Sequence, residues 1–576
     1  TNQSVIIHKK SGKSITYGEI ATIKSDLKIP KNVSLLDPSL FKIIGKSVKR
    51  IDTKYKINGS AEFGIDIQLP GMLLAAILHC PSFGGQILKF DQEAIESRNG
   101  VIKALQINNS IVVVSKQFWI ANQALQDAQS SGEIVFTSTE SSSQNIFNNL
   151  EEALNQGKPI KIEDEGDVEV ALSSNDVETI EAQYYVPFLP HAAMEPMNCT
   201  AKVEKNSCEI WTGTQVPDSA LEAAATAAAV PKNNTIIHNQ FLGGGFGRRA
   251  EVDVITEAVQ IANQFPGIPI KLIWSREEDM SQDYYRPAAM ARLTGSISTK
   301  SGNISAWKAS ISSAPMNGEF AKRNMGPLIG NIASRVADRF EIGGAVKPIY
   351  SINNRKISWL ESKTVVPTGT WRSVSNSFGA FFSESFVDEL ANSVKQDPYK
   401  LRSYLLQDKP RHLYALNLAA EKSEWKNPLG KNQGRGIAIH ESFGSIVCQV
   451  VEITISPQDW IKVDRVVTAI DVGFPINPEG IKSQVESSII YGLSAALFGE
   501  ITVKDGAVQE KNFDTVEVLR IFDSPVMETH IVNKGGPIGG AGEPGLPPIA
   551  PALTNAIFSA SGKRVRSLPI YSQNLS

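Results

Sequence analysis

One glycine-rich segment, FLGGGFGRRAEVDVITEA at residues 241–258, limits what this chain can fold into more than any other stretch. The β-like stretch NNTIIHNQ at 233–240 precedes it, and apolar residues at helical spacing follow: Val252, Ile255, Val259 and Ala262. The segment therefore predicts a strand, a glycine loop and a helix in succession. A loop of this kind brings backbone N–H groups close to a ligand, because glycine has no Cβ to block the approach.

The same loop fits a dinucleotide-binding pattern. Gly245, Gly247 and Ala250 satisfy G-x-G-x-x-A, in which a pyrophosphate sits at a helix N-terminus. A nicotinamide-dependent dehydrogenase is therefore one alternative. Against it, 43 glycines make a chance match easy. The first acidic residues after the following helix and strand, 277–279, also lie about 30 residues beyond the loop instead of about 20.

The composition excludes several classes of protein. A chain of 576 residues with 42% hydrophobic and 20% charged residues is typical of a globular protein of several domains. A net charge of -3 gives no basic surface for nucleic acid. The longest apolar run, GMLLAAIL at 71–78, is shorter than the roughly 20 residues of a membrane helix, so it predicts a buried strand and no membrane span. The first residues, TNQSVIIHKKSGKS, lack the apolar core of a signal peptide.

The cysteines indicate that the protein supplies no metal ligands. The chain has four cysteines, none in a C-x-x-C pair, and no histidine lies three to five residues from another. A zinc or iron–sulfur site made by this chain is therefore not expected, and any metal must arrive with its own ligands. The cysteines are expected to be core residues.

Patterns along the chain predict five regions. They are a lead-in at 1–41, a small strand-rich domain at 42–140, a polar and acidic linker at 141–170, and two larger domains at 171–430 and 431–576.

Helical patterns are expected at 217–230, at 377–394 with Phe378, Phe382, Phe386 and Leu390 on one face, and from Pro398 after an Asp397 cap. In the last region, 451–456 and 460–473 predict half-buried strands, and 484–498 predicts a helix.

A second glycine-rich loop, GGPIGGAGEPGLPP at 535–548, carries a single acid, Glu543. A helical pattern follows it and stops at Gly562. Glu543 is thus expected just ahead of a helix N-terminus, where the dipole stabilises a carboxylate by roughly 0.3–1 kcal/mol. Taken alone, such a residue is most simply a cap or an exposed turn acid.

Five motifs, each weak alone, occur together in this order: PHAAMEPMNCTA, WTGTQ, FLGGGFGRR, TWRSVSNSFGAFFSESFVDELA and GGPIGGAGEPGLPP. In combination they closely resemble the xanthine dehydrogenase and aldehyde oxidase family of molybdenum hydroxylases, and within it the large subunit of the isoquinoline 1-oxidoreductase type. The resemblance covers essentially the whole chain. It implies an α+β fold with a hammerhead domain at 42–140, followed by molybdopterin-binding domains at 171–430 and, incomplete, at 431–576.

The resemblance also implies which residues hold the cofactor. In this family the pterin dithiolene binds the molybdenum, which fits a chain without a His/Cys cluster. The residues that match positions near the cofactor are Gly244, Gly245, Phe246, Gly247, Arg372, Gln484 and Gly542. The implied cofactor is molybdopterin in its cytosine dinucleotide form, and the glycine loop is then a molybdopterin cradle rather than a pyrophosphate cradle.

Glu543 matches the family's catalytic base. By this resemblance it accepts the proton of a molybdenum-bound hydroxide whose oxygen, supplied by water, attacks an electron-poor carbon. Arg372 matches a cation that stabilises developing negative charge, with a surface salt bridge as the alternative. Gln484 matches a glutamine close to the cofactor, with a purely structural role as the alternative. His191 and Glu195 are expected to be structural polar groups beneath the site, without a chemical role.

The implied substrate is a nitrogen heteroaromatic compound or an aldehyde. Ala250, after Arg248 and Arg249, occupies about the position where the xanthine-oxidising branch has an acid, which argues against a purine. Val374 and Phe443 are candidates for shaping the substrate pocket.

Electrons left on the metal need an exit, so the resemblance implies a small iron–sulfur subunit as partner and a cytochrome c acceptor beyond it. In the isoquinoline branch, a segment with Glu-Met-Gly-Gln-Gly precedes the hammerhead domain, and no MGQG occurs in these 576 residues. Either the chain is a fragment or another chain supplies that segment, and the single chain is expected to bind molybdopterin poorly. A periplasmic location is expected from the family. A cofactor-free structural homologue or fragment is the remaining alternative.

Overall fold

The computed structural model describes residues 4–23, 31–324, 342 and 346–572. Its internal contacts divide the chain into two compact units, Thr1–Lys46 and Ser47–Ser576. The first unit holds an antiparallel hairpin of β1 (Val5–Ile7) and β2 (Ser14–Thr16), followed by α1 (Tyr17–Thr22). A capping box between Thr16 and Glu19 satisfies amide groups that the start of α1 leaves free.

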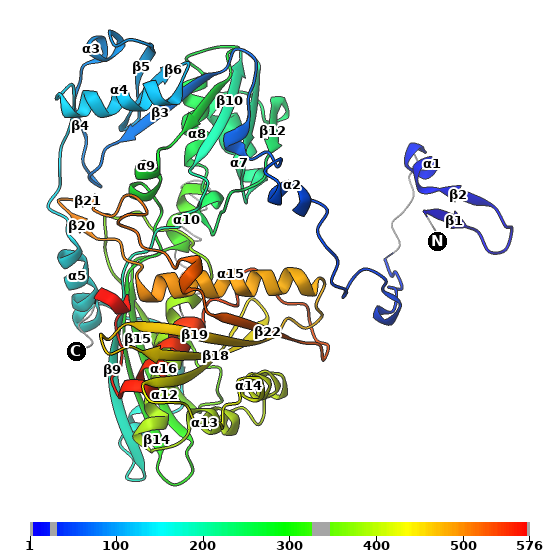
Figure 1. Ribbon diagram of the computed structural model, residues 1–576, viewed down its shortest axis with the longest axis vertical. Helices are drawn as coiled ribbons and strands as arrows, with labels where there is room; N and C mark the ends of the chain where they lie inside the picture. The colour runs from blue at the N-terminus through cyan, green and yellow to red at the C-terminus, as the bar shows by residue number, and fades with distance from the viewer. Residues whose placement is uncertain (1–3, 24–30, 325–341, 343–345, 573–576) are drawn as a thin grey trace. The chain divides into compact units, whose positions relative to one another are not determined.

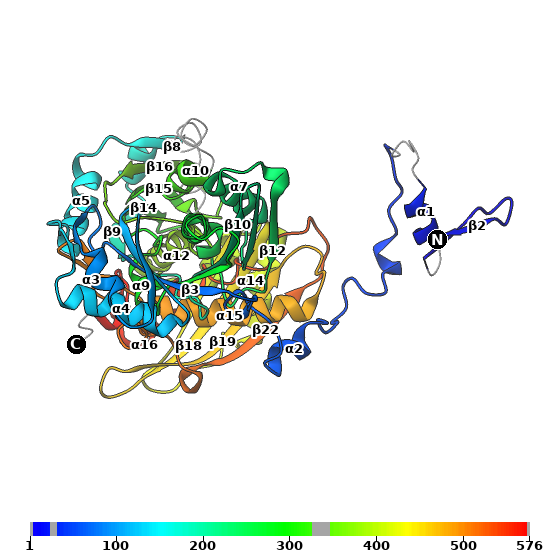
Figure 2. The same cartoon turned by 90° about the horizontal axis from the view of Figure 1, so that it is seen from above.

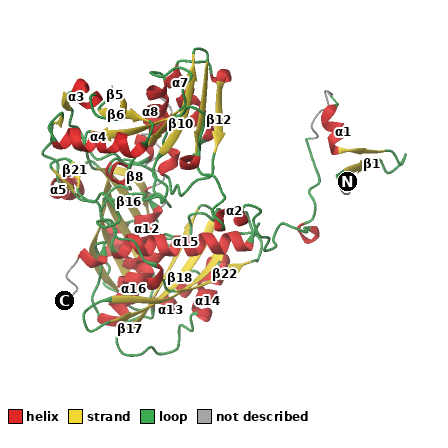
Figure 3. Cartoon of the chain, turned by 45° about the horizontal axis from the view of Figure 1, so that its top comes forward, coloured by secondary structure: helices red, strands yellow, loops and turns green. Residues whose placement is uncertain are grey.

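A mixed seven-stranded sheet forms one end of the second unit (Figure 1). Its order is β12-β11-β10-β13-β3-β6-β5, and helices α4, α7 and α8 pack on it (Figure 3). The strands are β3 (Leu73–His79), β5 (Val101–Ile107), β6 (Ser110–Ser115), β10 (Asn198–Glu204), β11 (Ser207–Thr212), β12 (Thr235–Asn239) and β13 (Ile270–Ile273). The helices are α4 (Phe118–Ser130), α7 (Pro217–Ala228) and α8 (Asp253–Ala262).

The buried strand predicted at 71–78 is confirmed as β3, in which Ala75, Ala76 and Ile77 are buried. β3 pairs antiparallel with β6 and parallel with β13. The sheet therefore runs through the predicted boundary between 42–140 and 171–430. A strand buried on both faces needs a hydrogen-bonded neighbour along each edge, and β13 provides the second one.

Smaller elements surround this sheet. They are α2 (Thr53–Ile57), β4 (Ile87–Phe90) paired with β7 (Ile134–Phe136), α3 (Gln92–Glu96), α9 (Arg276–Ser281), α10 (Asn317–Asn324) and the pair β20 (Val503–Lys504) and β21 (Ala507–Val508).

A five-stranded sheet in the order β8-β16-β15-β14-β9 follows (Figure 1). Its strands are β8 (Ile160–Glu165), β9 (Val177–Val186), β14 (Ala289–Ser298), β15 (Ile304–Ser313) and β16 (Asn354–Glu361). α12 (Asn376–Ser393) packs on β9 and β14, and the view from above shows the sheet passing beside it (Figure 2). The predicted apolar face of this helix is confirmed: Phe378, Phe382, Phe386 and Leu390 are at most 1% exposed.

The prediction of a linker at 141–170 is wrong at the level of local structure. α5 (Ser143–Gln156) buries Ile146 and Leu150, and β8 pairs with β16 at the edge of the five-stranded sheet. α6 (Val168–Leu172) follows. The polar composition was misleading because α5 is amphipathic and an edge strand keeps its acidic residues in solvent.

A four-stranded sheet, β17-β18-β19-β22, forms the other end of the unit (Figure 1). The strands are β17 (Gln433–Ser442), β18 (Ser445–Ile455), β19 (Ile461–Asp471) and β22 (Val526–Val532). α14 (Pro410–Lys422) and α16 (Ile549–Ser561) both pack on β18. The strands predicted at 451–456 and 460–473 are confirmed, and the end of β18 is half-buried as expected. Residues 466–471 of β19 are instead buried throughout, because α14 also packs on this strand.

The remaining helical predictions are also confirmed. α13 (Pro398–Leu405) begins after Asp397, whose carboxylate accepts the Lys400 amide. α15 (Pro478–Leu497) runs beside β22 and contacts α16 (Figure 1). α16 ends at Gly562, which has a left-handed φ of 74°. Within the described ranges, no helix combines the length and apolar character that crossing a membrane requires.

Candidate functional site

Arg372 is where two distant loops meet. Its Nε and Nη2 donate to the carbonyl of Gly542 at 3.0 and 2.6 Å, and its guanidinium lies 5.8 Å from the ring centre of Phe246. The glycine loop at 241–247 and the loop at 535–548 therefore share one side chain. Burial lowers the pKa of Arg372, while Tyr491 and Glu543 oppose that shift. Arg372 has no ion-pair partner in the described part of the chain, so it is not a surface salt bridge.

Gln484 lies on α15 and orients this arginine. Its Oε1 accepts from Arg372 Nη2 at 3.0 Å, and its backbone carbonyl accepts from the same nitrogen at 3.2 Å. Ser487, one helical turn further on, accepts from Nη1 at 2.9 Å. The first half of α15 thus fixes the guanidinium plane, since three acceptors match the fork of donors on arginine.

Glu543 is half-buried and is held at one oxygen. Its Oε1 accepts the Ser373 amide at 2.8 Å, and its backbone carbonyl accepts the Ser373 hydroxyl at 2.8 Å. Within the described residues its Oε2 has no hydrogen-bond partner. Glu543 lies in the loop ahead of α16, as expected, but residues 544–548 separate it from the helix. The dipole effect falls off within one turn, so it does not explain this position.

The glycine loop offers three consecutive backbone donors. The amides of Gly244, Gly245 and Phe246 have no hydrogen-bond partner among the described residues, although Gly245 is buried. Successive N–H groups of this kind form an anion-binding concavity, and leaving a buried amide unpaired is costly without a ligand. A Cβ on Gly247 would lie 1.6 Å from the Thr370 carbonyl oxygen, so only glycine fits there.

The sequence pattern for a dinucleotide site is not realised. A 3-10 turn, Arg248–Ala250, separates the glycine loop from α8, and the glycines do not stand at the helix N-terminus. β12, the strand before the loop, lies at the edge of its sheet. A pyrophosphate seated on the first turn of α8 therefore has no matching loop here.

Glu195 anchors the glycine loop, as expected of a structural group. Its two carboxylate oxygens accept the amides of Gly243 at 2.7 Å and Ile65 at 3.0 Å. Arg249 pairs with it at 3.1 Å and also donates to the Gly244 carbonyl at 3.0 Å.

A column of stacked rings, formed by Phe246, Tyr491 and Trp371, joins the glycine loop to α15 and to the segment that carries Arg372. Phe246 stacks on Tyr491 with ring centres 4.5 Å apart, and Tyr491 stacks on Trp371 at 4.8 Å. The column borders a largely apolar cavity of about 400 Å³, which neither Arg372 nor Glu543 lines. Sequence reasoning missed Tyr491, because nothing in its helical context distinguishes it from a core residue.

Strained backbone occurs around these loops. Five of the non-glycine residues with a left-handed φ lie here, with values of 49–74°: Ala192, Phe246, Ser373, Val374 and Phe443. Such conformations cost of order 1–3 kcal/mol each and cluster at functional sites. Val374 follows the residue that holds Glu543, and the Phe443 carbonyl accepts the Gly540 amide at 2.8 Å. Both pocket candidates thus lie beside the Glu543 loop, and their effect on substrate choice stays a prediction.

The described residues contain no group of three His, Cys, Asp or Glu side chains that could hold a metal ion. The four cysteines are free and buried. A metal at these loops would therefore need ligands that the described part of the chain does not supply.

Comparison with known proteins agrees with this geometry. Two family models, each described as a molybdopterin cofactor-binding domain, match residues 150–404 and 375–525. The beta subunit of isoquinoline 1-oxidoreductase from Brevundimonas diminuta is 27% identical over 99% of this chain and 78% of its own length. A subunit of nicotinate dehydrogenase from Pseudomonas putida is 24% identical over 98% of this chain and 49% of its own length.

Solved structures share the fold. Quinoline 2-oxidoreductase from Pseudomonas putida 86 matches with a TM-score of 0.76 at 14% identity, over 92% of this chain and 97% of that one. Aldehyde oxidoreductase from Desulfovibrio gigas matches with a TM-score of 0.71 at 14% identity, over 92% and 80%.

The fold and the matched domains define the class as a molybdopterin-binding oxidoreductase chain. The α+β fold implied by the five motifs is confirmed. The chain belongs to the xanthine dehydrogenase and aldehyde oxidase family of molybdenum hydroxylases. Neither this family nor the geometry of the glycine loop supports the dinucleotide-dehydrogenase alternative.

Proposed function

We propose that this chain oxidises a nitrogen heteroaromatic compound or an aldehyde, with water as the oxygen source and Glu543 as the general base. The setting of Glu543 carries the proposal. The Ser373 amide fixes one carboxylate oxygen at 2.8 Å, and the other oxygen has no partner among the described residues. A carboxylate held in this way can take up a proton at its free oxygen without changing position.

The loops fit an oxygen-rich, anionic group such as molybdopterin. The amides of residues 244–246 are unpartnered within the described chain, and so are those of residues 541–543 on the second loop. A Cβ on Gly542 would meet nothing within 4 Å, so open space lies beside Glu543. When bound there, molybdopterin would supply a metal that accepts two electrons and lowers the pKa of water.

The chain's own residues then have distinct tasks. Gly244, Gly245 and Phe246 hold the cofactor with backbone donors, and Gly247 lets the loop pass close to Thr370. Arg372 places a fixed cation beside the reacting atoms. Glu543 accepts the proton of the water-derived oxygen that attacks the substrate carbon. Gln484 and Gly542 keep Arg372 in register with Glu543, since both accept its hydrogen bonds.

Partner chains complete the proposal. Both curated relatives described above are named as subunits, which supports an assembly of several chains. We infer a small iron–sulfur subunit that removes electrons, a cytochrome c acceptor, and a further chain segment at the cofactor. We also infer the cytosine dinucleotide form of molybdopterin and a periplasmic location. Co-purification, nucleotide analysis of the released cofactor and cell fractionation test these points.

The decisive variant is Glu543→Gln in the complete assembly, assayed with a dye acceptor against azaarenes and aldehydes. Loss of the base should lower kcat by about 10²–10⁴-fold while molybdenum content stays near that of the wild type. Glu486→Gln is the control, because Glu486 is an exposed acid on α15 near Gln484. Retained activity in Glu543→Gln contradicts the assignment, and an assembly without molybdenum supports the cofactor-free alternative.

A further inference from the structure

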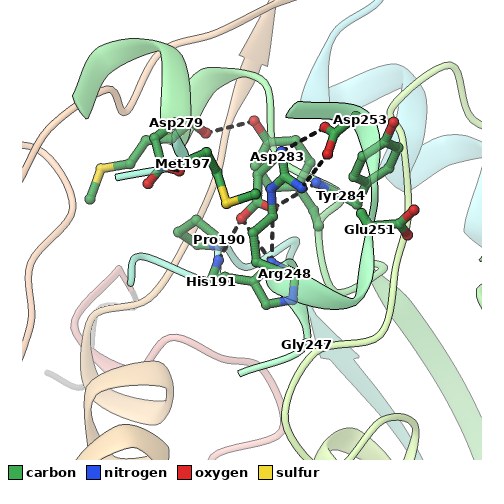
Figure 4. A network of polar contacts seen from close by, with 12 residues as sticks. Pro190, His191, Met197, Gly247, Arg248, Glu251, Asp253, Asp279, Asp283 and Tyr284 are labelled. Atoms are coloured by element: carbon green, nitrogen blue, oxygen red, sulfur yellow. Dashed lines mark hydrogen bonds and ion pairs between the residues drawn. The ribbon is translucent and has the colours of Figure 1, made fainter. Parts of the chain in front are cut away.

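A buried cluster of charged side chains lies beneath the glycine loop, centred on His191 and Asp283 (Figure 4). His191, Asp283 and Arg248 are each 2% exposed. The proposed function gives none of them a task. Their hydrogen bonds nevertheless reach the segment that carries Arg372 and Ser373.

Both ring nitrogens of His191 meet hydrogen-bond acceptors. Nδ1 lies 2.8 and 3.0 Å from the two carboxylate oxygens of Asp283. Nε2 lies 3.0 Å from the backbone carbonyl oxygen of Thr370. A carbonyl has no proton to donate, and neutral histidine carries only one N–H. Asp283 accepts the amides of His191 at 2.6 Å and Tyr284 at 2.7 Å, as an ionised carboxylate does. With Asp283 ionised, both ring contacts can be hydrogen bonds only if each nitrogen carries a proton.

The charges of the cluster lead to the same protonation state. Arg248 donates to Asp253 at 2.9 and 2.7 Å, and its Nε lies 3.2 Å from Asp283. One guanidinium thus faces two carboxylates, the half-buried Asp253 and the buried Asp283. A positive His191 makes this set of four groups neutral, as a largely buried position favours. Burial opposes ionisation of Asp283, but His191 and Arg248 outweigh it and hold the pKa of that carboxyl below its ordinary value.

The surrounding acids have cations of their own. Asp279 pairs with Arg276 at 2.5 Å. Glu251 pairs with Arg323 at 2.5 Å. Arg276 and Arg323 are therefore already paired and do not balance the charges of Asp253 and Asp283, which leaves His191 as the second cation.

His191 also joins three segments of the site. Its carbonyl accepts the hydroxyl of Tyr491, on α15, at 2.7 Å. A Cβ on Gly247 would lie 3.1 Å from its Nε2, so the glycine loop rests directly on the ring. Thr370, which Nε2 contacts, stands two residues before Arg372 and three before Ser373.

We propose that His191 is a doubly protonated positioning residue. With Asp283 it clamps the Thr370 carbonyl and so sets the positions of Arg372 and Ser373, and through Ser373 the position of Glu543. The protonation state stands on the structure alone. Its effect on turnover rests on the function proposed above.

The first test is NMR of the full chain labelled with ¹⁵N-histidine and carrying no cofactor. With 7 histidines the spectrum is sparse, and His191→Gln assigns the signals by their loss. His191 should show two ring N–H signals with imidazolium nitrogen shifts. In Asp283→Asn, it should retain only one ring proton, because the charge that stabilises the second is gone. A wild-type ring with one unprotonated nitrogen overturns the proposal.

His79 offers a matched control. It is also held between two acceptors, Glu278 at 2.7 Å and Glu257 at 2.9 Å, and it ties β3 to α8 and α9 instead of the site loops. Burial lowers the pKa of His79, but these two carboxylates outweigh it and raise the pKa to about 10. His79→Gln therefore removes an equivalent pair of hydrogen bonds away from Thr370.

The second test compares the two variants in the assembled, molybdenum-loaded enzyme. His191→Gln should lower kcat about tenfold or more with KM within about twofold, because small misplacement of reacting groups costs rate rather than affinity. His79→Gln should leave both within about twofold. Equal kcat values in the two variants overturn the positioning role. The NMR result is readable even if the assembly proves inactive, so failure of the proposed function is distinguishable from failure of this inference.

Discussion

Two glycines of the site are expected to be needed for different reasons: Gly247 for the packing of the loop, and Gly542 for the space that the cofactor occupies. At Gly247, φ is 113° and a Cβ would lie 1.6 Å from the Thr370 oxygen. The backbone strain for alanine is of order 1–3 kcal/mol, and overpacking adds about 1–3 kcal/mol as the loop and the Thr370 segment move apart. We therefore expect Gly247→Ala to reduce the free energy of unfolding by about 2–6 kcal/mol, or to displace the loop.

Gly542 is the matched comparison. A Cβ there meets nothing within 4 Å, and the residue has no left-handed φ. Gly542→Ala should leave stability unchanged or raise it by about 0.4–1 kcal/mol through the unfolded state. In the assembled enzyme, however, the added methyl group occupies the space assigned to the cofactor, so molybdenum content should fall.

Urea unfolding of both variants, monitored by tryptophan fluorescence, measures the difference between their midpoint urea concentrations, provided that their m values are equal. Metal analysis of the two assemblies measures cofactor retention. Unfolding of Gly247→Ala at the same urea concentration as Gly542→Ala would contradict the packing role of Gly247. A wild-type content of molybdenum in Gly542→Ala would contradict the place assigned to the cofactor.

Two further predictions concern charge. Arg372→Lys should lower kcat/KM by about 10²-fold, because a lysine ammonium cannot serve Gly542, Gln484 and Ser487 together; steady-state kinetics check this, and wild-type kinetics would contradict it. Burial lowers the pKa of His440 from 6.5 to about 4. Because the folded state disfavours the charged ring, His440 contributes about 3 kcal/mol to the free energy of unfolding above pH 6.5. That contribution is lost as the pH falls from 6.5 toward 4. In His440→Gln, the loss of stability between pH 6.5 and pH 4 should be smaller than in the wild type, as measured by urea unfolding at both pH values. An equal loss in variant and wild type would contradict this role of His440.

Elements with a continuous buried face were predictable from the sequence. The phenylalanines of α12 recur every four residues and are all buried, and the apolar run of β3 is a central strand. Gly562 ends α16 because its left-handed backbone suits glycine. In each case the signal is local, since neighbours in the chain determine the pattern.

Elements whose burial depends on distant parts of the chain were not predictable. β18 is buried because α14 and α16 cover it, and the seven-stranded sheet exists because β13 joins β3. The polar region at 141–170 folds because β16 offers an edge to β8. A single-sequence pattern contains none of these partners.

The same division holds within the site. Motif resemblance identified Phe246, Arg372, Gln484 and Gly542, and the other three are each seen to contact Arg372, while their roles stay predictions. The Ser373 amide that holds Glu543 lies 170 residues away from it, and Asp283 lies 92 residues from His191. Hydrogen bonds across such separations leave no periodic signal in the sequence.

The central claim is that a metal cofactor binds between the unpartnered amides at 244–246 and the free oxygen of Glu543. A crystal structure of the loaded assembly, with anomalous data at the molybdenum edge, tests it most directly. We expect an anomalous peak beside Glu543 Oε2, with the glycine-loop amides donating to the same group. A peak elsewhere in the chain, or a Glu543 side chain turned away from it, would contradict the account.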